Sequence, residues 1–89
     1  MKQIIRDNNS GFYGMLVAIE TDHITSVNLQ INYNNELTTC GVAITTICGN
    51  QYFIPTGLTS EGYSVIIHAR NIITEWVRTG KINLEGVNI

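Results

Sequence analysis

The hydrophobic pattern of this chain changes its period once. Up to about residue 54 it alternates or forms short apolar runs, which is typical of strands. Beyond residue 64 apolar residues recur every three or four positions, which predicts a helix. The strands are expected at residues 3–7, 12–20, 24–33, 37–48 and 51–54. The helix is expected to carry its apolar stripe on Val65, Ile66, Ala69, Ile72, Ile73, Trp76 and Val77.

The third predicted strand shows the most regular alternation. Its apolar positions are Val27, Leu29, Ile31 and Tyr33, and its polar positions are Ser26, Asn28, Gln30 and Asn32. Strict alternation indicates an antiparallel strand with one buried face. We expect the apolar face to contact the helix at Ile66, Ala69, Ile73 and Trp76.

Single residues mark the ends and bends of these elements. Gly41 is expected at a bulge or bend, and Pro55 either ends the fifth strand or places it at a sheet edge. Thr59 or Ser60 is the expected N-cap of the helix, and Gly80 its C-terminal stop. Residues 81–84 are expected to form a short strand or an extended tail.

The predicted fold class is α+β. It consists of an antiparallel meander of four to five strands followed by one helix on one sheet face, in a single domain spanning residues 1–89. The second strand is apolar on both faces, so Phe12, Leu16 and Ala18 should lie on the face that the helix leaves uncovered. The C-terminal tail, curling of the sheet or a second copy of the chain could cover them. We expect an oligomer interface there, because a paired subunit enlarges the core of so short a chain.

Composition narrows the classes of function. Charged residues make up 13% of the chain and the formal net charge is -2, against about 25% charged residues in a typical domain. Five basic residues are too few for a duplex nucleic-acid surface. No apolar run approaches a membrane span and no signal peptide is evident, so a cytoplasmic location is expected. Low charge suits a surface covered by a partner, although codon bias explains it equally well.

The two cysteines do not indicate a disulfide, a metal site or a catalytic nucleophile. Cys40 and Cys48 lie eight residues apart in one predicted strand, roughly 26 Å at strand rise, so they can neither pair nor share a metal. Buried reduced thiols are the expected state. Cys40 as a nucleophile would need His23 or His68 as base, and no pattern brings either near it.

The segment before the helix resembles an anion-binding loop only in its glycines. Residues 57–64 have P-loop glycine spacing, but Tyr63 stands where the phosphate-binding lysine belongs, which excludes nucleotide hydrolysis. A capped helix start explains the segment, and weak anion binding at the helix N-terminus is the alternative.

Candidate binding residues lie off the main apolar stripe of the helix. An aromatic ring, an imidazole and two guanidinium groups could hold a small anionic ligand or an acidic partner there, unless the face is simply solvated. The candidates are Tyr63, Ile67, His68, Arg70, Asn71 and Arg78.

The function expected from these patterns is binding rather than catalysis. The chain is expected to be a non-enzymatic homo-oligomer, without metal or cofactor, that binds a protein partner or a small anionic ligand at a subunit interface. An inhibitor or sequestering protein would fit this size and charge. The alternatives are a small enzyme with an interface site using Cys40, His68 or Tyr63, and a structural subunit of a larger assembly.

Overall fold

The computed structural model describes residues 2–7, 15–34 and 37–83. Two short 3-10 turns, η1 (Thr21–His23) and η2 (Thr59–Glu61), accompany the main elements. Those elements are β1 (Lys2–Asp7), β2 (Met15–Glu20), β3 (Ile24–Asn34), β4 (Leu37–Thr46), β5 (Gln51–Leu58) and α1 (Tyr63–Thr79). The predicted α+β class is confirmed. The single meander is not, because the strands form two antiparallel sheets, one of β1 and β2 and one of β3, β4 and β5 in that order.

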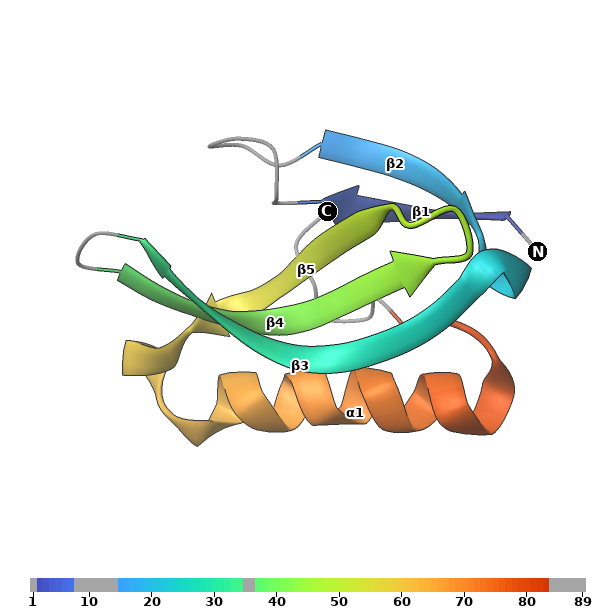
Figure 1. The fold of residues 1–89 in the computed structure, drawn as a ribbon. Coiled ribbons are helices and arrows are strands. Elements are labelled where there is room, and N and C mark those ends of the chain that lie inside the picture. Colours follow the sequence, from blue (N-terminus) through green and yellow to red (C-terminus); the bar gives the residue numbers. More distant parts are fainter. Residues whose placement is uncertain (1, 8–14, 35–36, 84–89) are drawn as a thin grey trace.

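The helix packs across one face of the three-stranded sheet, mainly over β4 (Figure 1). Val42 and Ile44 of β4 are fully buried there, as is Ala69 of α1. Burying one such Val or Ile side chain stabilises a fold by about 1.5–3 kcal/mol. The core of the domain therefore lies between β4 and α1.

Gly41 lies at a bulge, as the sequence predicts. The β4–β5 register shifts between Cys40 and Gly41. A Cβ atom at Gly41 would lie 2.3 Å from the carbonyl oxygen of Ile54 and 2.7 Å from the ring of Phe53. Only glycine leaves room for that approach. Pro55 does not end β5, which continues to Leu58, so the edge-strand alternative is the correct one within this sheet.

The β1–β2 hairpin closes the β5 side of the sheet. Ile5 and Ile19 belong to the same buried cluster as the β4 and α1 residues. The carboxylate of Asp7 accepts a hydrogen bond from the backbone N–H of Phe53 at 2.9 Å. A side chain thus provides the acceptor for one backbone N–H on the outer edge of β5. The hairpin lies beside β5 but forms a separate sheet, because the contact is made by a side chain and not by backbone pairing of β5 with β1 or β2 (Figure 1).

The segment after α1 returns to β1. The amide of Gln3 donates to the carbonyl oxygen of Ile82 and accepts the N–H of Ile82 at 3.3 Å. Ile82 is thereby buried in the core. Residues 81–83 form no strand, which favours the extended-tail alternative for the part of the tail that the structure describes.

The structure confirms the predicted C-terminal end of α1 but not its predicted N-cap. Gly80 adopts a left-handed conformation (φ 74°) and donates its N–H to the carbonyl of Trp76 at 2.8 Å, as expected of a C-terminal stop. The predicted N-cap is wrong. Thr59 and Ser60 lie in η2, whose Glu61 accepts the N–H of Leu58, and the helix begins after Gly62 at φ 104°.

The apolar face of β3 is covered at one end only. Val27 is buried at 8% exposure, whereas Leu29 and Ile31 are about 40% exposed and Tyr33 is 82% exposed. Burial beneath the helix is therefore confirmed for Val27 and wrong for Tyr33, while Leu29 and Ile31 are only partly covered. One helix is about 10 Å wide and packs mainly on β4, while β3 lies a further strand spacing of about 4.8 Å away.

Candidate functional site

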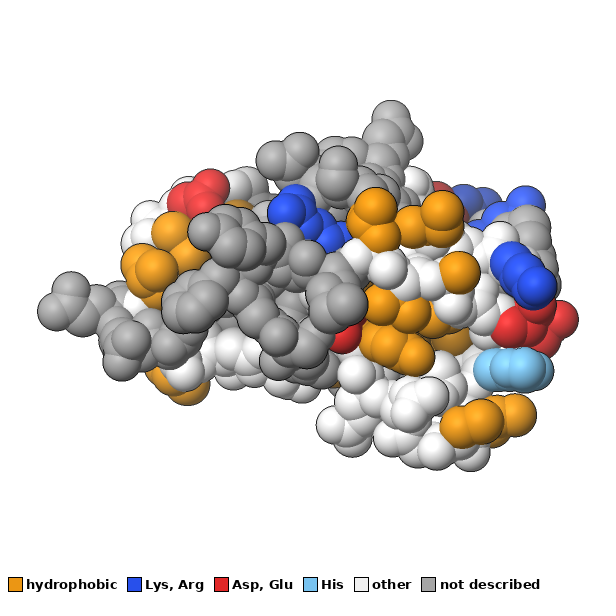
Figure 2. Space-filling view, turned by 90° about the horizontal axis from the view of Figure 1, so that it is seen from above, with side chains coloured by type: hydrophobic (Ala, Val, Ile, Leu, Met, Phe, Trp, Pro, Cys, Tyr) orange, Lys and Arg blue, Asp and Glu red, His pale blue; other side chains and the backbone are white. Residues whose placement is uncertain are grey.

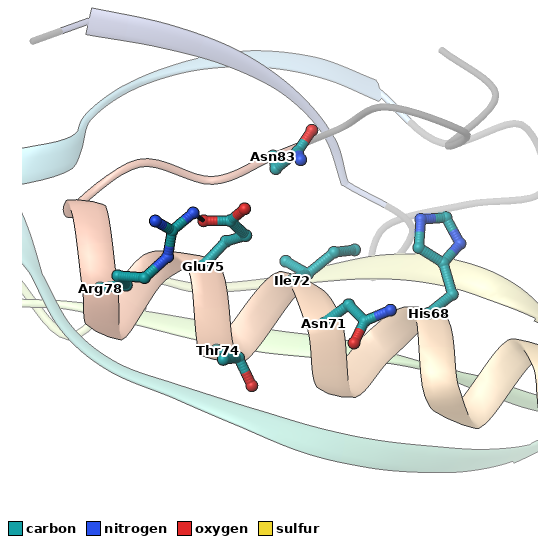
Figure 3. A pocket seen from close by; sticks show the side chains of 7 residues that line it. All are labelled: His68, Asn71, Ile72, Thr74, Glu75, Arg78 and Asn83. Carbon is teal, nitrogen blue, oxygen red and sulfur yellow. Dashed lines mark hydrogen bonds and ion pairs between the residues drawn. The ribbon is translucent and has the colours of Figure 1, made fainter.

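A polar pocket lies between α1 and the segment that follows it. Its volume is about 380 Å³. Figure 3 shows the α1 side chains with Asn83 facing them from the returning segment. We call it the α1 pocket, and it is lined by His68, Asn71, Ile72, Thr74, Glu75, Arg78 and Asn83.

The charges in the α1 pocket are already paired. The guanidinium of Arg78 donates to the carboxylate of Glu75 at 2.5 Å, one turn earlier on the helix (Figure 3). An anion entering the pocket would have to compete with this carboxylate for Arg78. Binding of a small anion there therefore requires that Arg78 exchange the Glu75 carboxylate for the ligand.

The predicted binding residues are divided between two sides of the helix. His68, Asn71 and Arg78 meet in the α1 pocket. Tyr63, Ile67 and Arg70 do not line it. At about 100° per residue, Ile67 points away from the sheet and Arg70 lies on the flank opposite the pocket. The sequence could not separate these groups, because all six lie off the buried stripe.

The residues predicted at an oligomer interface are exposed where the structure describes them. Leu16 is 64% exposed, Ala18 is exposed, and Phe12 lies outside the described residues. The β1–β2 register places Ile4 opposite Ala18 and Arg6 opposite Leu16 on this outer face, with Lys2 opposite Glu20. Figure 2 views the molecule from the hairpin side and shows hydrophobic side chains mixed with charged ones.

A second apolar region follows β3 and the neighbouring flank of α1. The β3–β4 register places Leu29 opposite Val42 and Ile31 opposite Cys40, so these side chains share the face that α1 covers over β4. Ile66, Ile73 and Val77 lie on the α1 flank opposite the α1 pocket. We define the β3–α1 surface as the exposed Leu29, Ile31, Tyr33 and Val77 together with Ile66 and Ile73, which are partly buried against the core. The alternation along β3 gave no sign of this surface, because it marks Leu29, Ile31 and Tyr33 as buried beneath the helix.

The two cysteines differ in environment. Cys40 is fully buried within β4, as predicted. Cys48 is exposed, so the expectation that it is buried is wrong. The reason is that β4 ends at Thr46 and Cys48 lies in the following turn, not in the strand. Both thiols are free.

The described residues contain neither a metal-binding cluster nor a membrane-spanning helix. No group of three or more His, Cys, Asp or Glu side chains in residues 2–7, 15–34 and 37–83 is placed to hold a metal ion. Within the same ranges, no helix has the length and apolar character that crossing a membrane requires.

No family model, no curated protein and no solved structure matches this chain.

Proposed function

We propose that this chain is a non-enzymatic binding protein that works as a homo-oligomer and acts by contact with protein surfaces. The observation that carries the proposal is the number of large apolar side chains left in solvent. Leu29, Ile31 and Tyr33 on β3 are joined by Leu16 on β2 and Val77 on α1. Scattered apolar residues are normal on a surface, but Leu29, Ile31 and Tyr33 lie on one face of one strand, and grouped apolar residues mark contact sites.

The low charge of the chain supports the same proposal. A net charge of -2 gives weak repulsion between copies, and interface centres are poor in charged residues. Sedimentation velocity between about 1 and 100 μM tests it, with native mass spectrometry reporting the subunit number. A dimer or higher oligomer is expected. A chain that stays monomeric across this range contradicts the proposal.

The α1 pocket supports a second candidate, a small anionic ligand. His68, Asn71 and Arg78 converge there from one side of the helix. Titration calorimetry with inorganic phosphate tests this idea, with Arg78→Gln as the variant and Arg70→Gln as the control on the opposite flank. Binding that Arg78→Gln abolishes and Arg70→Gln retains would support it, and no heat of binding with the unmodified protein would exclude phosphate.

The enzyme alternative finds little support in the geometry. Cys40 is fully buried in β4, His68 lines the α1 pocket and Tyr63 lies outside it. Alkylation tests the thiol version, because a nucleophile must be reachable. In the folded protein one equivalent of iodoacetamide should react, at Cys48. Rapid modification of Cys40 would revive the Cys40 alternative.

The structural-subunit alternative predicts a different response to mutation. If the hairpin face is an assembly contact, Leu16→Glu should abolish assembly before any ligand binding is affected. Arg6 lies opposite Leu16 in the hairpin, so Arg6→Gln serves as a control on the same face. Assembly that tolerates Leu16→Glu would remove the hairpin face as the contact.

A further inference from the structure

The outer edge of β3 is unusual for a strand at the border of a sheet. Among the described strands only β4 pairs with it. β3 runs for 11 residues, ITSVNLQINYN, without one charged residue, proline or glycine. Natural proteins protect such edges with charges, prolines, bulges or short strands, because an unprotected edge pairs with another chain. The one irregularity in its pairing lies at the beginning, between Ile24 and Ser26.

The backbone groups that point outward from this edge follow from the hydrogen bonds of β4. The N–H of Ile47 donates to His23 at 2.8 Å, toward β3, and that of Thr46 donates to Asn50 at 3.0 Å, toward β5. Direction alternates along an antiparallel strand, so Thr45 and Ala43 also point toward β3.

The partners of these two β4 residues are Ser26 and Asn28, which must therefore point their backbone groups toward β4. Continued along β3, the alternation sends the backbone N–H and C=O groups of Val27, Leu29, Ile31 and Tyr33 to the open edge. The bond from the Phe53 N–H to Asp7, away from β4, agrees, because Phe53 is paired with Ala43.

We propose that two copies of this chain join through their β3 edges, antiparallel and centred on Gln30, to form one continuous six-stranded sheet. This inference rests on the proposed homo-oligomer and names its contact. Centring on Gln30 pairs Leu29 with the partner's Ile31 and Val27 with the partner's Tyr33. Both members of each pair carry outward-pointing backbone groups, so four such pairs would exchange about eight hydrogen bonds.

The side chains of β3 require an axis that passes through a residue, and Gln30 is the residue about which all four of Val27, Leu29, Ile31 and Tyr33 are paired. Opposed residues in an antiparallel pair share a face, so a two-fold axis at a residue matches apolar with apolar positions. An axis between residues would set Leu29 against Gln30 and mix the faces. On the polar face, Asn28 would meet the partner's Asn32, and no like charges would oppose each other.

The hairpin offers a less suitable contact for a second copy. Its exposed Ile4, Leu16 and Ala18 share their face with Lys2, Arg6 and Glu20. β2 spans six residues against the 11 of β3. The β3 edge also adjoins the flank of α1 that carries Ile66, Ile73 and Val77, with Arg70 as its one charged residue, and this flank would face the partner across the axis. The six residues of the β3–α1 surface would therefore lose solvent together.

A cysteine scan tests the contact and its register. In a Cys48→Ser background, Gln30→Cys should form an intermolecular disulfide in most of the protein under copper–phenanthroline oxidation. The two sulfur-bearing residues would oppose each other at a non-hydrogen-bonded pair, with Cα atoms about 4.5 Å apart, which a disulfide can span. Gln30 is exposed in the single chain, so folding should tolerate the change.

Asn28→Cys is the matched control, since it is exposed on the same strand and face. It would lie about 13 Å from its own copy and should not cross-link alone. Mixed with Asn32→Cys, it should form a heterodimeric disulfide. Cross-linking of Asn28→Cys alone in preference to Gln30→Cys would overturn the register.

The outcomes separate this inference from the proposed function. If sedimentation shows an oligomer and Gln30→Cys does not cross-link, the β3 contact is wrong and the homo-oligomer stands. If the protein is monomeric at 100 μM, both are wrong. If Leu16→Glu dissociates an oligomer in which Gln30→Cys does not cross-link, the hairpin is the contact instead.

Discussion

The two edge strands of the three-stranded sheet, β3 and β5, differ in whether other described residues cover their outer edges. Beside β5, the chain covers its own edge. Asp7 is hydrogen-bonded to the backbone of Phe53, Gln3 is hydrogen-bonded to Ile82, and Ile5 is buried. Beside β3, the described residues supply no cover, and Tyr33 remains 82% exposed. In the proposed dimer, the second copy would cover this border.

Among the described strands, the charges lie in the hairpin. The hairpin that closes the β5 side contains Lys2, Arg6, Asp7 and Glu20, whereas β3 contains no charged residue. The difference in charge separates the hairpin from the whole three-stranded sheet, because β4 and β5 also contain no charged residue. What distinguishes β3 from the covered edge strand β5 is that β3 also contains neither proline nor glycine, whereas β5 contains Pro55 and Gly57.

The largest expected effect is on the closed border. Ile5→Ala should lower the free energy of unfolding by about 2–5 kcal/mol, because Ile5 is fully buried in the shared core and its truncation leaves a cavity. Urea unfolding followed by circular dichroism measures the loss. Ile4→Ala, at an exposed neighbouring position, should change it by less than about 0.5 kcal/mol. Equal losses in the two variants would mean that the hairpin does not close the core as described.

A smaller effect is expected from the side chain that satisfies the β5 edge. Asp7→Ala should lower the free energy of unfolding by about 1–3 kcal/mol, because the buried N–H of Phe53 loses its acceptor. Asp7→Asn keeps an oxygen acceptor and should retain more of the stability. Chemical denaturation of both variants provides the measurement. An Asn variant as unstable as the Ala variant would show that the hydrogen bond to Phe53 is not the main role of Asp7.

The open border should respond in association rather than in folding. Ile31→Lys places a charge beside the proposed two-fold axis and should weaken dimerisation at least tenfold, or about 1.4 kcal/mol. Its effect on unfolding should be about 1 kcal/mol, since Ile31 is 40% exposed in the single chain. Analytical ultracentrifugation separates the two effects.

Ile67→Lys is the control for this prediction. Ile67 is also exposed but lies on the side of α1 that faces away from the sheet, so its replacement should leave dimerisation unchanged. Equal weakening by Ile67→Lys and Ile31→Lys would place the contact on the outer face of α1 and count against the β3 edge.

The smallest effect is expected in the α1 pocket. Glu75→Gln removes the ion pair with Arg78, whose side chain is 69% exposed, and should cost about 0.2–1 kcal/mol of unfolding free energy. Added salt should shrink the difference, because solvent screens exposed charges. Thermal melts at low and high salt measure it. A loss above about 2 kcal/mol would give the pair a structural role that its exposure does not suggest.

Local patterns in the sequence were sufficient for the elements of this fold. The period change after residue 64 predicted α1, alternation predicted β3, and Gly41 and Gly80 were correctly placed at a bulge and a helix end. These features depend on residues close together in the chain. Of the candidate binding residues, the sequence predicted His68, Asn71 and Arg78, which line one pocket, but gave no sign that Asn83 completes it.

Contacts distant in sequence decided the rest. Asp7 meets Phe53, which is 46 residues away, and Gln3 meets Ile82, which is 79 residues away, so no local pattern could show that the hairpin would close the β5 side. The position of α1 over β4 left Leu29 and Ile31 exposed although their alternation marks them as buried. Periodicity tells which side chains share a face, whereas the width and position of the covering element determine how much of that face leaves the solvent.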